Sequence, residues 1–311
     1  MSTNLSARNV GSFAGIAISE AKSGAIGEVV SVFTNSLYIK TTNQELIFIS
    51  SRETKSPITI NVESNANMQQ IIKPLATVSL HENRIDIGES VSIDLTRVVP
   101  WDLETVARPQ DFRELKEKLH LGSLILMIVD NRLSVLDQNG FTHSSAMQWV
   151  KEGVLPLRHS DDAEGFRIAA QDLVGLGSGF TPSGDDLLGG FLAAYNSFSR
   201  RAWRKTICIQ FDTLEKKTNW ISAKLLDFMQ REVLDEQMSM LIESTNAHGS
   251  DRFILALETL LPRGHTSGID ILVGVLLALG LLHDIAEGDD ITATLVRRLR
   301  LTSEDSLSQV R

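Results

Sequence analysis

The chain has 311 residues, of which 42% are hydrophobic and 22% are charged, so its composition is that of a folded globular protein. Its 30 basic and 39 acidic side chains leave a formal net charge of -9, which disfavours nucleic acid as a partner because most of such a surface repels phosphate. A single cysteine, Cys208, excludes an intrachain disulfide.

The N-terminus and the most apolar stretch predict a cytoplasmic protein with no membrane partner. Residues 1–10 are polar and lack the apolar segment of a secretion signal. The most apolar run, residues 271–282, is shorter than a bilayer requires and contains two glycines. This run therefore predicts a buried helix.

About the first hundred residues predict β structure. Valine, isoleucine, threonine and serine dominate several extended runs, and clusters of turn residues separate the runs at short intervals. This pattern is typical of a small antiparallel sheet or barrel. The runs cover residues 27–39, 45–51, 58–62, 76–80 and 90–95.

The next segment predicts one helix and one hairpin. Pro109 suits the first position of a helix over residues 109–119. Residues 123–129 and 132–136 are two apolar runs that flank Asp130-Asn131, a pair that suits a tight turn. The β-rich part is therefore expected to extend to about residue 155.

The remainder of the chain predicts mainly helices. In the helix expected over residues 251–261, the expected core positions are Phe253, Leu255, Leu257 and Leu260. We therefore expect an α+β fold, with a β-rich domain over residues 1–155 and a mainly helical domain over residues 156–311. The predicted helices cover residues 162–173, 220–244, 251–261 and 292–299.

Two related segments of the helical part stand out by their glycine, serine and aspartate content. The first segment, residues 175–190, reads GLGSGFTPSGDDLLGG, and the second segment, residues 264–274, reads GHTSGIDILVG. A shift of 84 positions aligns the shared Ser-Gly-x-Asp pattern of the two and the apolar runs that follow. A glycine-rich loop before a helix exposes backbone N–H donors at the positive end of the helix dipole, which suits a carboxylate or phosphate. The repeat predicts two helix N-termini that share one cleft.

Helix capping is a simpler explanation for part of this pattern. Ser183 with Asp186, and Ser267 with Asp270, have the spacing of a capping box. A capping box requires neither Asp185 nor His265, so capping does not explain these two residues. Neighbouring carboxylates raise each other's pKa or bind a cation, and a histidine in a loop can act as an acid, a base or an anion ligand.

Three other kinds of site fit the pattern less well. Asp185, Asp186 and Asp270 supply hard oxygen ligands that suit Mg²⁺, so a magnesium-dependent hydrolase is one alternative, whereas no cysteine and histidine cluster suits zinc. A Ser183, His265 and Asp186 triad lacks the Gly-x-Ser-x-Gly elbow of the hydrolases that use one. The glycine spacing does not match a dinucleotide fingerprint.

Both segments resemble one protein family, that of the oxamate carbamoyltransferase small subunit in allantoin degradation. The resemblance rests on GLGSGFTPSGDD from Gly175 and on GHTSGxD from Gly264, and it is strongest over residues 170–282. It implies a transferase that works with other carbamoyltransferase subunits and exchanges a carbamoyl group between phosphate and oxamate. A small-anion-binding regulatory subunit without catalytic groups is the alternative.

The residue types in the two segments suggest which of them would bind the substrates and which would take part in catalysis. One group of backbone and hydroxyl donors would hold one anion and a second group would hold the other, while Asp185, Asp186 or Asp270 would position a proton or a cation. We therefore predict Asp185, Asp186, His265 and Asp270 as catalytic candidates. The predicted substrate-binding residues are Gly177, Gly179, Thr181, Ser183 and Gly184 in the first segment and Thr266, Ser267 and Gly268 in the second.

Overall fold

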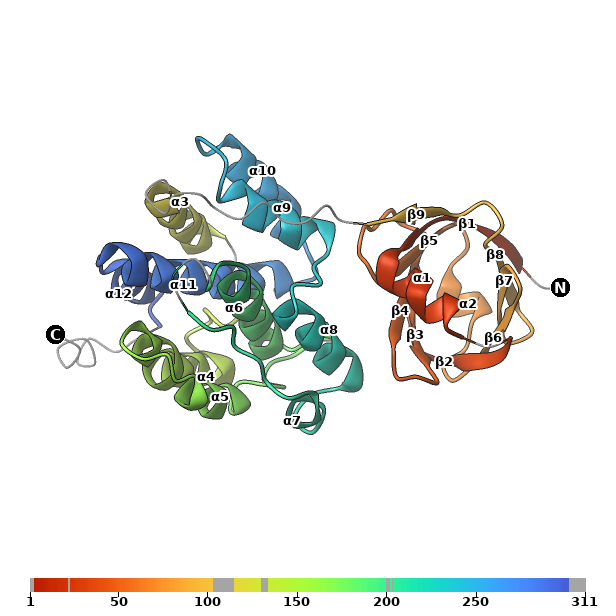
Figure 1. Cartoon of the computed structure of the whole chain (residues 1–311), viewed down its shortest axis with the longest axis horizontal. Helices are drawn as coiled ribbons and strands as arrows, with labels where there is room; N and C mark the ends of the chain where they lie inside the picture. The colour runs from red at the N-terminus through yellow and green to blue at the C-terminus, as the bar shows by residue number, and fades with distance from the viewer. Residues whose placement is uncertain are drawn as a thin grey trace. The chain divides into compact units, whose positions relative to one another are not determined.

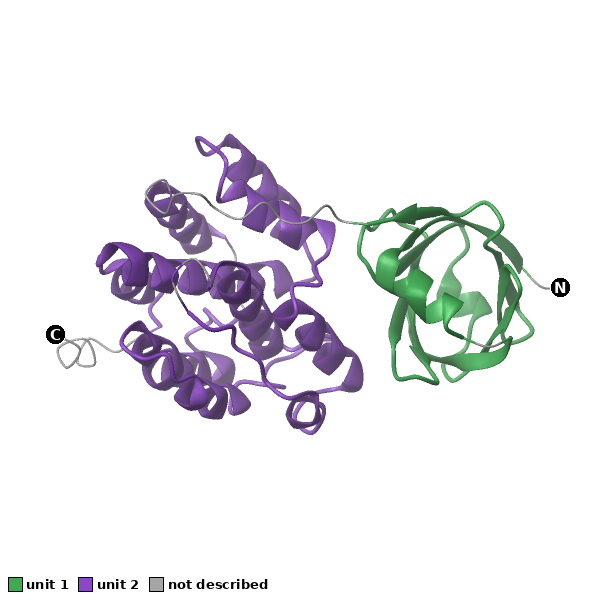
Figure 2. Ribbon diagram, viewed as in Figure 1, with its two compact units in different colours: residues 1–105 green, residues 106–311 purple. Residues whose placement is uncertain are grey.

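The computed structural model describes residues 3–21, 23–102, 115–129, 134–199, 202 and 204–301. The chain divides into two compact units, residues 1–105 and residues 106–311 (Figure 2). Each unit has its own hydrophobic core, one formed from the strands and the other from the helices.

Unit 1 is a small barrel of mixed strand direction. Its sheet runs in the order β5-β4-β3-β2-β6-β7-β8-β1-β9, and β1 also pairs with β5, which closes the sheet (Figure 1). The closing pair is antiparallel, with Val10 opposite Ile60, whereas β1 runs parallel to β8 and β4 runs parallel to β5. The strands are β1 (Thr3–Gly11), β2 (Gly24–Val32), β3 (Ser36–Thr41), β4 (Leu46–Ser50), β5 (Thr59–Glu63), β6 (Thr77–His81), β7 (Arg84–Ile87), β8 (Val91–Asp94) and β9 (Val99–Trp101).

Alternation of side chains explains why these runs close into a barrel. In β3 every second residue is buried, and Leu37 and Ile39 reach the core together with residues of the other strands. The helices α1 (Ser12–Ser19) and α2 (Met68–Ile71) contribute Ala14 and Met68 to the same core. The expected barrel is confirmed, although its pairing is mixed and not wholly antiparallel.

Unit 2 is built around two helices, α6 (Ser183–Ser199) and α11 (Ser267–Glu287), which are buried along nearly their whole length. By length and composition α11 could cross a membrane, but 89% of its most apolar window is buried inside the protein, as in a core helix. The surrounding elements are α3 (Leu115–Ile128), α4 (Phe141–Trp149), a π-helix (Val150–Val154), a 3-10 helix (Leu155–Arg158), α5 (Glu164–Gln171), α7 (Phe211–Glu215), α8 (Trp220–Gln230), α9 (Glu236–Ser244), α10 (Asp251–Leu260) and α12 (Ile291–Arg298).

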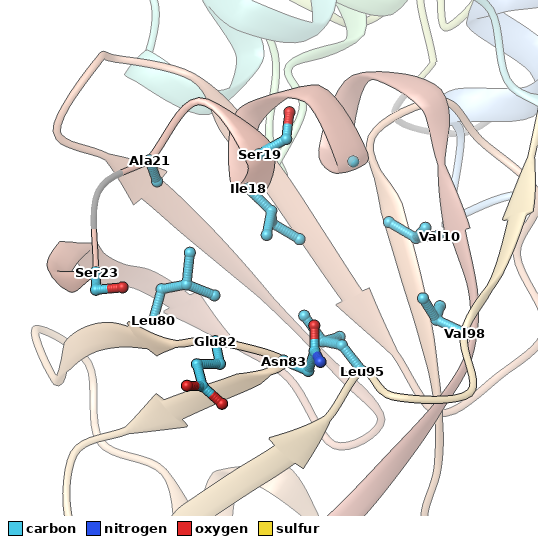
Figure 3. A pocket seen from close by; sticks show the side chains of 11 residues that line it. Val10, Ile18, Ser19, Ala21, Ser23, Leu80, Glu82, Asn83, Leu95 and Val98 are labelled. Carbon is cyan, nitrogen blue, oxygen red and sulfur yellow. The ribbon is translucent and has the colours of Figure 1, made fainter.

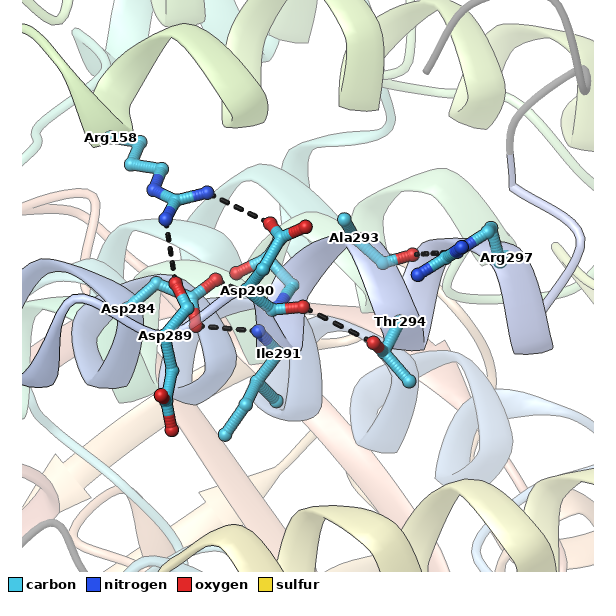
Figure 4. A network of polar contacts seen from close by, with 9 residues as sticks. Arg158, Asp284, Asp289, Asp290, Ile291, Ala293, Thr294 and Arg297 are labelled. Atoms are coloured by element: carbon cyan, nitrogen blue, oxygen red, sulfur yellow. Dashed lines mark hydrogen bonds and ion pairs between the residues drawn. The ribbon is translucent and has the colours of Figure 1, made fainter. Parts of the chain in front are cut away.

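A polar network connects the end of α11 to the start of α12 (Figure 4). The Asp284 carboxylate accepts from Ile291 N at 2.6 Å and from Thr292 N at 2.8 Å, so it satisfies two N–H groups that the first turn of α12 cannot pair. The Arg158 guanidinium donates to Asp289 O and to Asp290 Oδ1. This network anchors the turn between the two helices.

The two units divide near residue 105. The boundary expected from the sequence was near residue 155. The predicted hairpin is wrong, because residues 123–128 continue α3, and residues 130–133 lie outside the described residues. Leu119, Gly122 and Leu126 lie on one buried face of α3, and Gly122 brings this helix against Leu276 of α11. An apolar run of this kind suits either a strand or a helix, and here its packing against α11 favours the helix.

The predicted helices are confirmed in part. Residues 109–114 lie outside the described residues, and the expected helix over 220–244 is broken into α8 and α9, where Asp235 caps α9 by accepting from Met238 N. Among the expected core positions of α10, Leu255 is wrong: it is 53% exposed because it lies opposite the buried Phe253 and Leu257.

Candidate functional site

Helices α6 and α11 pack closely against each other at a reciprocal pair of glycines. A Cβ on Gly190 would collide with the carbonyl oxygen of Ile271, and a Cβ on Gly274 would collide with the carbonyl oxygen of Leu187. Both glycines and both carbonyls are related by the shift of 84 positions. The repeat in the sequence is therefore a pseudo-symmetric helix pair, and only glycine allows its two backbones to lie so close.

The crossing brings the two helix N-termini together. Thr181 Oγ1 lies 3.2 Å from Ser267 Oγ, and Ser183 Oγ lies 3.4 Å from Thr266 Oγ1. Each contact joins one segment to the other. The four predicted substrate-binding hydroxyls of the two segments thus form one cluster, which we call the hydroxyl cluster.

The two aspartates of the repeated pattern lie against this cluster. Asp186 Oδ2 accepts from Thr181 Oγ1 at 2.9 Å, and the Ser267 hydroxyl also bonds to this carboxylate. Asp270 Oδ1 accepts from Val135 N at 2.8 Å, and the hydroxyls of Ser183 and Thr266 lower the pKa of this carboxyl. Each aspartate therefore faces the serine of the opposite segment.

This arrangement does not match a pair of capping boxes. Ser183 and Ser267 are the first residues of their helices, and the cap of α11 is Thr266, whose side chain makes no capping hydrogen bond. The serine and aspartate of each segment serve the contact across the pair, which the simpler explanation did not anticipate.

Burial changes the acidity of both aspartates. Removal from water raises the pKa of Asp186 to about 6, against the lowering effect of Ser267, Thr181 and the Arg263 guanidinium. Removal from water, with a smaller contribution from the charge of Asp186, raises the pKa of the fully buried Asp270 to about 7. Both groups therefore exchange protons near neutral pH.

Asp185 points away from the cluster. Its Oδ1 accepts from Gly175 N at 2.7 Å, and its Oδ2 accepts from Thr218 Oγ1 at 2.5 Å and from Ser222 Oγ at 2.7 Å. Burial is the main reason why its pKa is raised. These contacts give Asp185 the role of an anchor that connects the glycine loop to α8, and its catalytic assignment stays a prediction.

The predicted glycines fall into two classes. Gly177 and Gly179 are exposed, with φ values of 111° and 113° that L side chains rarely adopt. Gly184 and Gly268 are buried, and a Cβ at either would collide with the carbonyl oxygen of Leu173 or Leu260 respectively. A Cβ on Gly177 would also lie 2.7 Å from Ser183 N, so Gly177, Gly184 and Gly268 all permit close packing and only Gly179 has space around it.

Backbone donors remain available in both segments. Within the described residues, the N–H groups of residues 177–179 and 264–267 donate no backbone hydrogen bond. They precede the N-termini of α6 and α11, where the helix dipole favours negative charge. N–H groups near a helix N-terminus are donors that suit the oxygens of a carboxylate or phosphate.

His265 lies on the exposed loop immediately before Thr266. No hydrogen bond from its ring to another described residue is present, so its predicted acid or base role stays a prediction. The same part of the chain holds residues that the sequence analysis missed. Arg263 lies close enough to lower the pKa of Asp186, and the buried His143 contacts Val135 O through Nδ1 at 2.8 Å. His143 and Asp270 thus both bond to the backbone of Val135, although they lie 127 positions apart in the sequence.

The described residues provide no group of three or more histidine, cysteine, aspartate or glutamate side chains that could hold a metal ion. Asp185 and Asp186 are adjacent in sequence but bond to different partners, so they do not converge on one cation. The magnesium alternative therefore gains no support from the geometry.

A separate cavity of about 410 Å³ lies in unit 1 (Figure 3). Val10, Ile18 and Leu80 are among its apolar lining residues, and Glu82 is its acidic one. It contains none of the residues of the two repeated segments. The carboxylate of Glu82 and the apolar residues make this lining less suited to an anion than the hydroxyl cluster, which is the better candidate for the predicted chemistry.

Comparison with protein families gives two matches. The model of the oxamate carbamoyltransferase subunit AllH matches residues 173–279, and the model of the AllH family N-terminal domain matches residues 10–100. The first match contains both repeated segments and the second covers most of the barrel. No curated protein and no solved structure shows significant similarity to the chain. Together the two family matches, which span more than half of the chain, show that it belongs to the AllH family of oxamate carbamoyltransferase subunits.

Proposed function

We propose that this chain provides the anion-binding part of an oxamate carbamoyltransferase, in association with other carbamoyltransferase subunits. The observation that carries the proposal is the contact between the two segments through Thr181–Ser267 and Ser183–Thr266. The loops that lead to these hydroxyls hold N–H groups that donate no backbone hydrogen bond within the described residues, at positions 177–179 and 264–267. A site of this kind can hold two small anions side by side.

Such a site fits the chemistry of carbamoyl transfer. In the direction that forms carbamoyl phosphate, a phosphate oxygen attacks the carbamoyl carbon of oxalurate and forms a C–O bond. The C–N bond to oxamate then breaks, and the oxamate nitrogen takes up the proton that phosphate releases. Backbone N–H donors stabilise the negative oxygen of the tetrahedral intermediate.

The test is an assay of carbamoyl phosphate formation from oxalurate and phosphate, with the full chain alone and together with its partner subunits. We expect activity in the complex, and we expect the double variant Thr181→Ala, Ser267→Ala to lose at least tenfold in kcat/KM. Folding of the variant is checked by its melting temperature. Absence of activity in every combination of folded subunits would refute the proposal.

A second candidate is an anion-binding subunit that carries no catalytic group of its own. The contacts of Asp185 favour it, because three donors already bond to this carboxylate. His265→Gln separates the two candidates. Unchanged turnover in the complex, with unchanged anion affinity, would support the non-catalytic candidate for this residue.

A further inference from the structure

The direction of the hydroxyl hydrogens limits what the cluster can bind. A serine or threonine hydroxyl has one hydrogen and two lone pairs. Thr181 donates its hydrogen to Asp186 Oδ2, and Ser267 also bonds to that carboxylate. With the carboxylate ionised, both hydroxyls turn their hydrogens inward and present lone pairs to the outside. An anion placed against them would be repelled.

A second observation concerns Asp270. Its Oδ2 atom is fully buried and has no hydrogen-bond partner of good geometry among the described residues. When ionised, this oxygen depends on neighbouring hydroxyls to compensate for its burial, whereas a protonated oxygen can donate to one of them. Ser183 and Thr266 are the hydroxyls that lie next to it.

The two observations concern different carboxylates of one pair, and in each case a proton on the carboxylate would release hydroxyl hydrogens that now bond to it. We propose that the Asp186–Asp270 pair takes up one proton from solvent when an anion binds at the hydroxyl cluster, so that the hydroxyls of Thr181 and Ser267 turn their hydrogens toward the anion. The ligand class is a carboxylate or a tetrahedral oxyanion, and both aspartates are positioning residues that act through the hydroxyls. This inference depends on the proposed function, because it requires an anion at this site.

The charges around the pair set the pH range of this uptake. Burial raises the pKa of both carboxyls, to about 6 for Asp186 and to about 7 for Asp270. Arg263 lowers the pKa of Asp186, Asp185 raises it, and Asp186 raises that of Asp270. A bound anion adds negative charge and raises both pKa values further, which is the physical reason for proton uptake.

The experiment is calorimetric titration of the full chain with sulfate and with oxamate between pH 5.5 and pH 8.5. Neither probe changes its own charge in this range, so any proton belongs to the protein. Buffers with different heats of ionisation report the number of protons directly. We expect uptake that approaches one proton at pH 8 and a loss of affinity of roughly fivefold from pH 7 to pH 8, because the free pair already holds about half a proton at pH 7.

Two variants locate the proton. Asp186→Asn keeps a neutral side chain in place, so we expect it to bind sulfate at pH 8 about as tightly as the wild type does at pH 6. Asp284→Asn is the matched control, since Asp284 is a buried aspartate at the other end of α11 whose pKa is also raised by burial. It should keep the wild-type pH dependence.

The outcomes separate the two proposals. Equal affinity at all pH values, with no proton uptake, would overturn this inference and leave the proposed anion site intact. Loss of the pH dependence in Asp284→Asn, but not in Asp186→Asn, would also overturn it. Absence of binding by either anion at every pH would overturn both proposals.

Discussion

The contact between α6 and α11 predicts that Gly274→Ala is destabilising even though alanine favours helices. The new Cβ would lie 2.6 Å from Phe191 N and would also collide with the carbonyl oxygen of Leu187. These are backbone atoms of a buried helix, so they cannot rotate away as a side chain can. Overpacking of about 3 kcal/mol, less roughly 1 kcal/mol gained in helix propensity, gives a net loss of about 2 kcal/mol.

The assay is thermal unfolding of the full chain by calorimetry. For a unit of this size, about 2 kcal/mol corresponds to a fall of roughly 4–8 °C in the transition of unit 2. Separation of the helices would also weaken sulfate binding, because the two N-termini would no longer meet.

Gly280→Ala is the matched control in the same helix. Its Cβ would meet Leu295 Cδ1 at 2.8 Å, the end of a side chain that can change its rotamer. We expect its stability to lie within about 1 kcal/mol of the wild type. If both variants melted at the same temperature as the wild type, the backbone contact would not be the constraint described above.

Three further predictions concern the charged groups. The pKa of Asp270 is higher in the folded chain than in the unfolded one, so the folded state binds more protons. The protonated Asp270 therefore stabilises the folded state at pH 4, and this stabilisation is lost as pH rises through about 7. Chemical denaturation should therefore show Asp270→Asn gaining stability relative to the wild type from pH 5 to pH 8; an unchanged difference would contradict the raised pKa. Asp185→Ala leaves three donors unpaired and should lower the free energy of unfolding in urea by about 3 kcal/mol, whereas a loss below about 0.5 kcal/mol would exclude the anchor role. Arg263→Gln removes a charge that lowers the pKa of Asp186, so the pH midpoint of sulfate binding should move upward, and a downward shift would contradict the assignment.

Several features could be predicted from the sequence because they depend on local pattern. Alternating apolar residues and turn clusters indicated the barrel, and the shift of 84 positions indicated a helix pair with adjacent N-termini. The structure confirms both, since the reciprocal contacts of Gly190 and Gly274 follow the same shift. The short strands β7 and β9 were missed, because three or four residues carry too little periodic signal.

The roles of the three aspartates could not be predicted, because their partners lie far away in the sequence. Asp185 was favoured since a cap does not require it, yet Thr218 and Ser222 make it an anchor. Asp270 was also a catalytic candidate, although its spacing from Ser267 suited a cap; complete burial and an oxygen without a partner make it the more unusual group.

The sequence by itself therefore determined the two classes of unit, the repeated loop and helix, and the residue types that an anion site needs. These properties follow from the spacing of neighbouring residues along the chain. Only the tertiary structure decided that Thr181 meets Ser267 and that Asp186 and Asp270 lose their contact with water. Such properties depend on which surfaces are buried together, and burial is what raises the pKa values on which the proposed proton uptake depends.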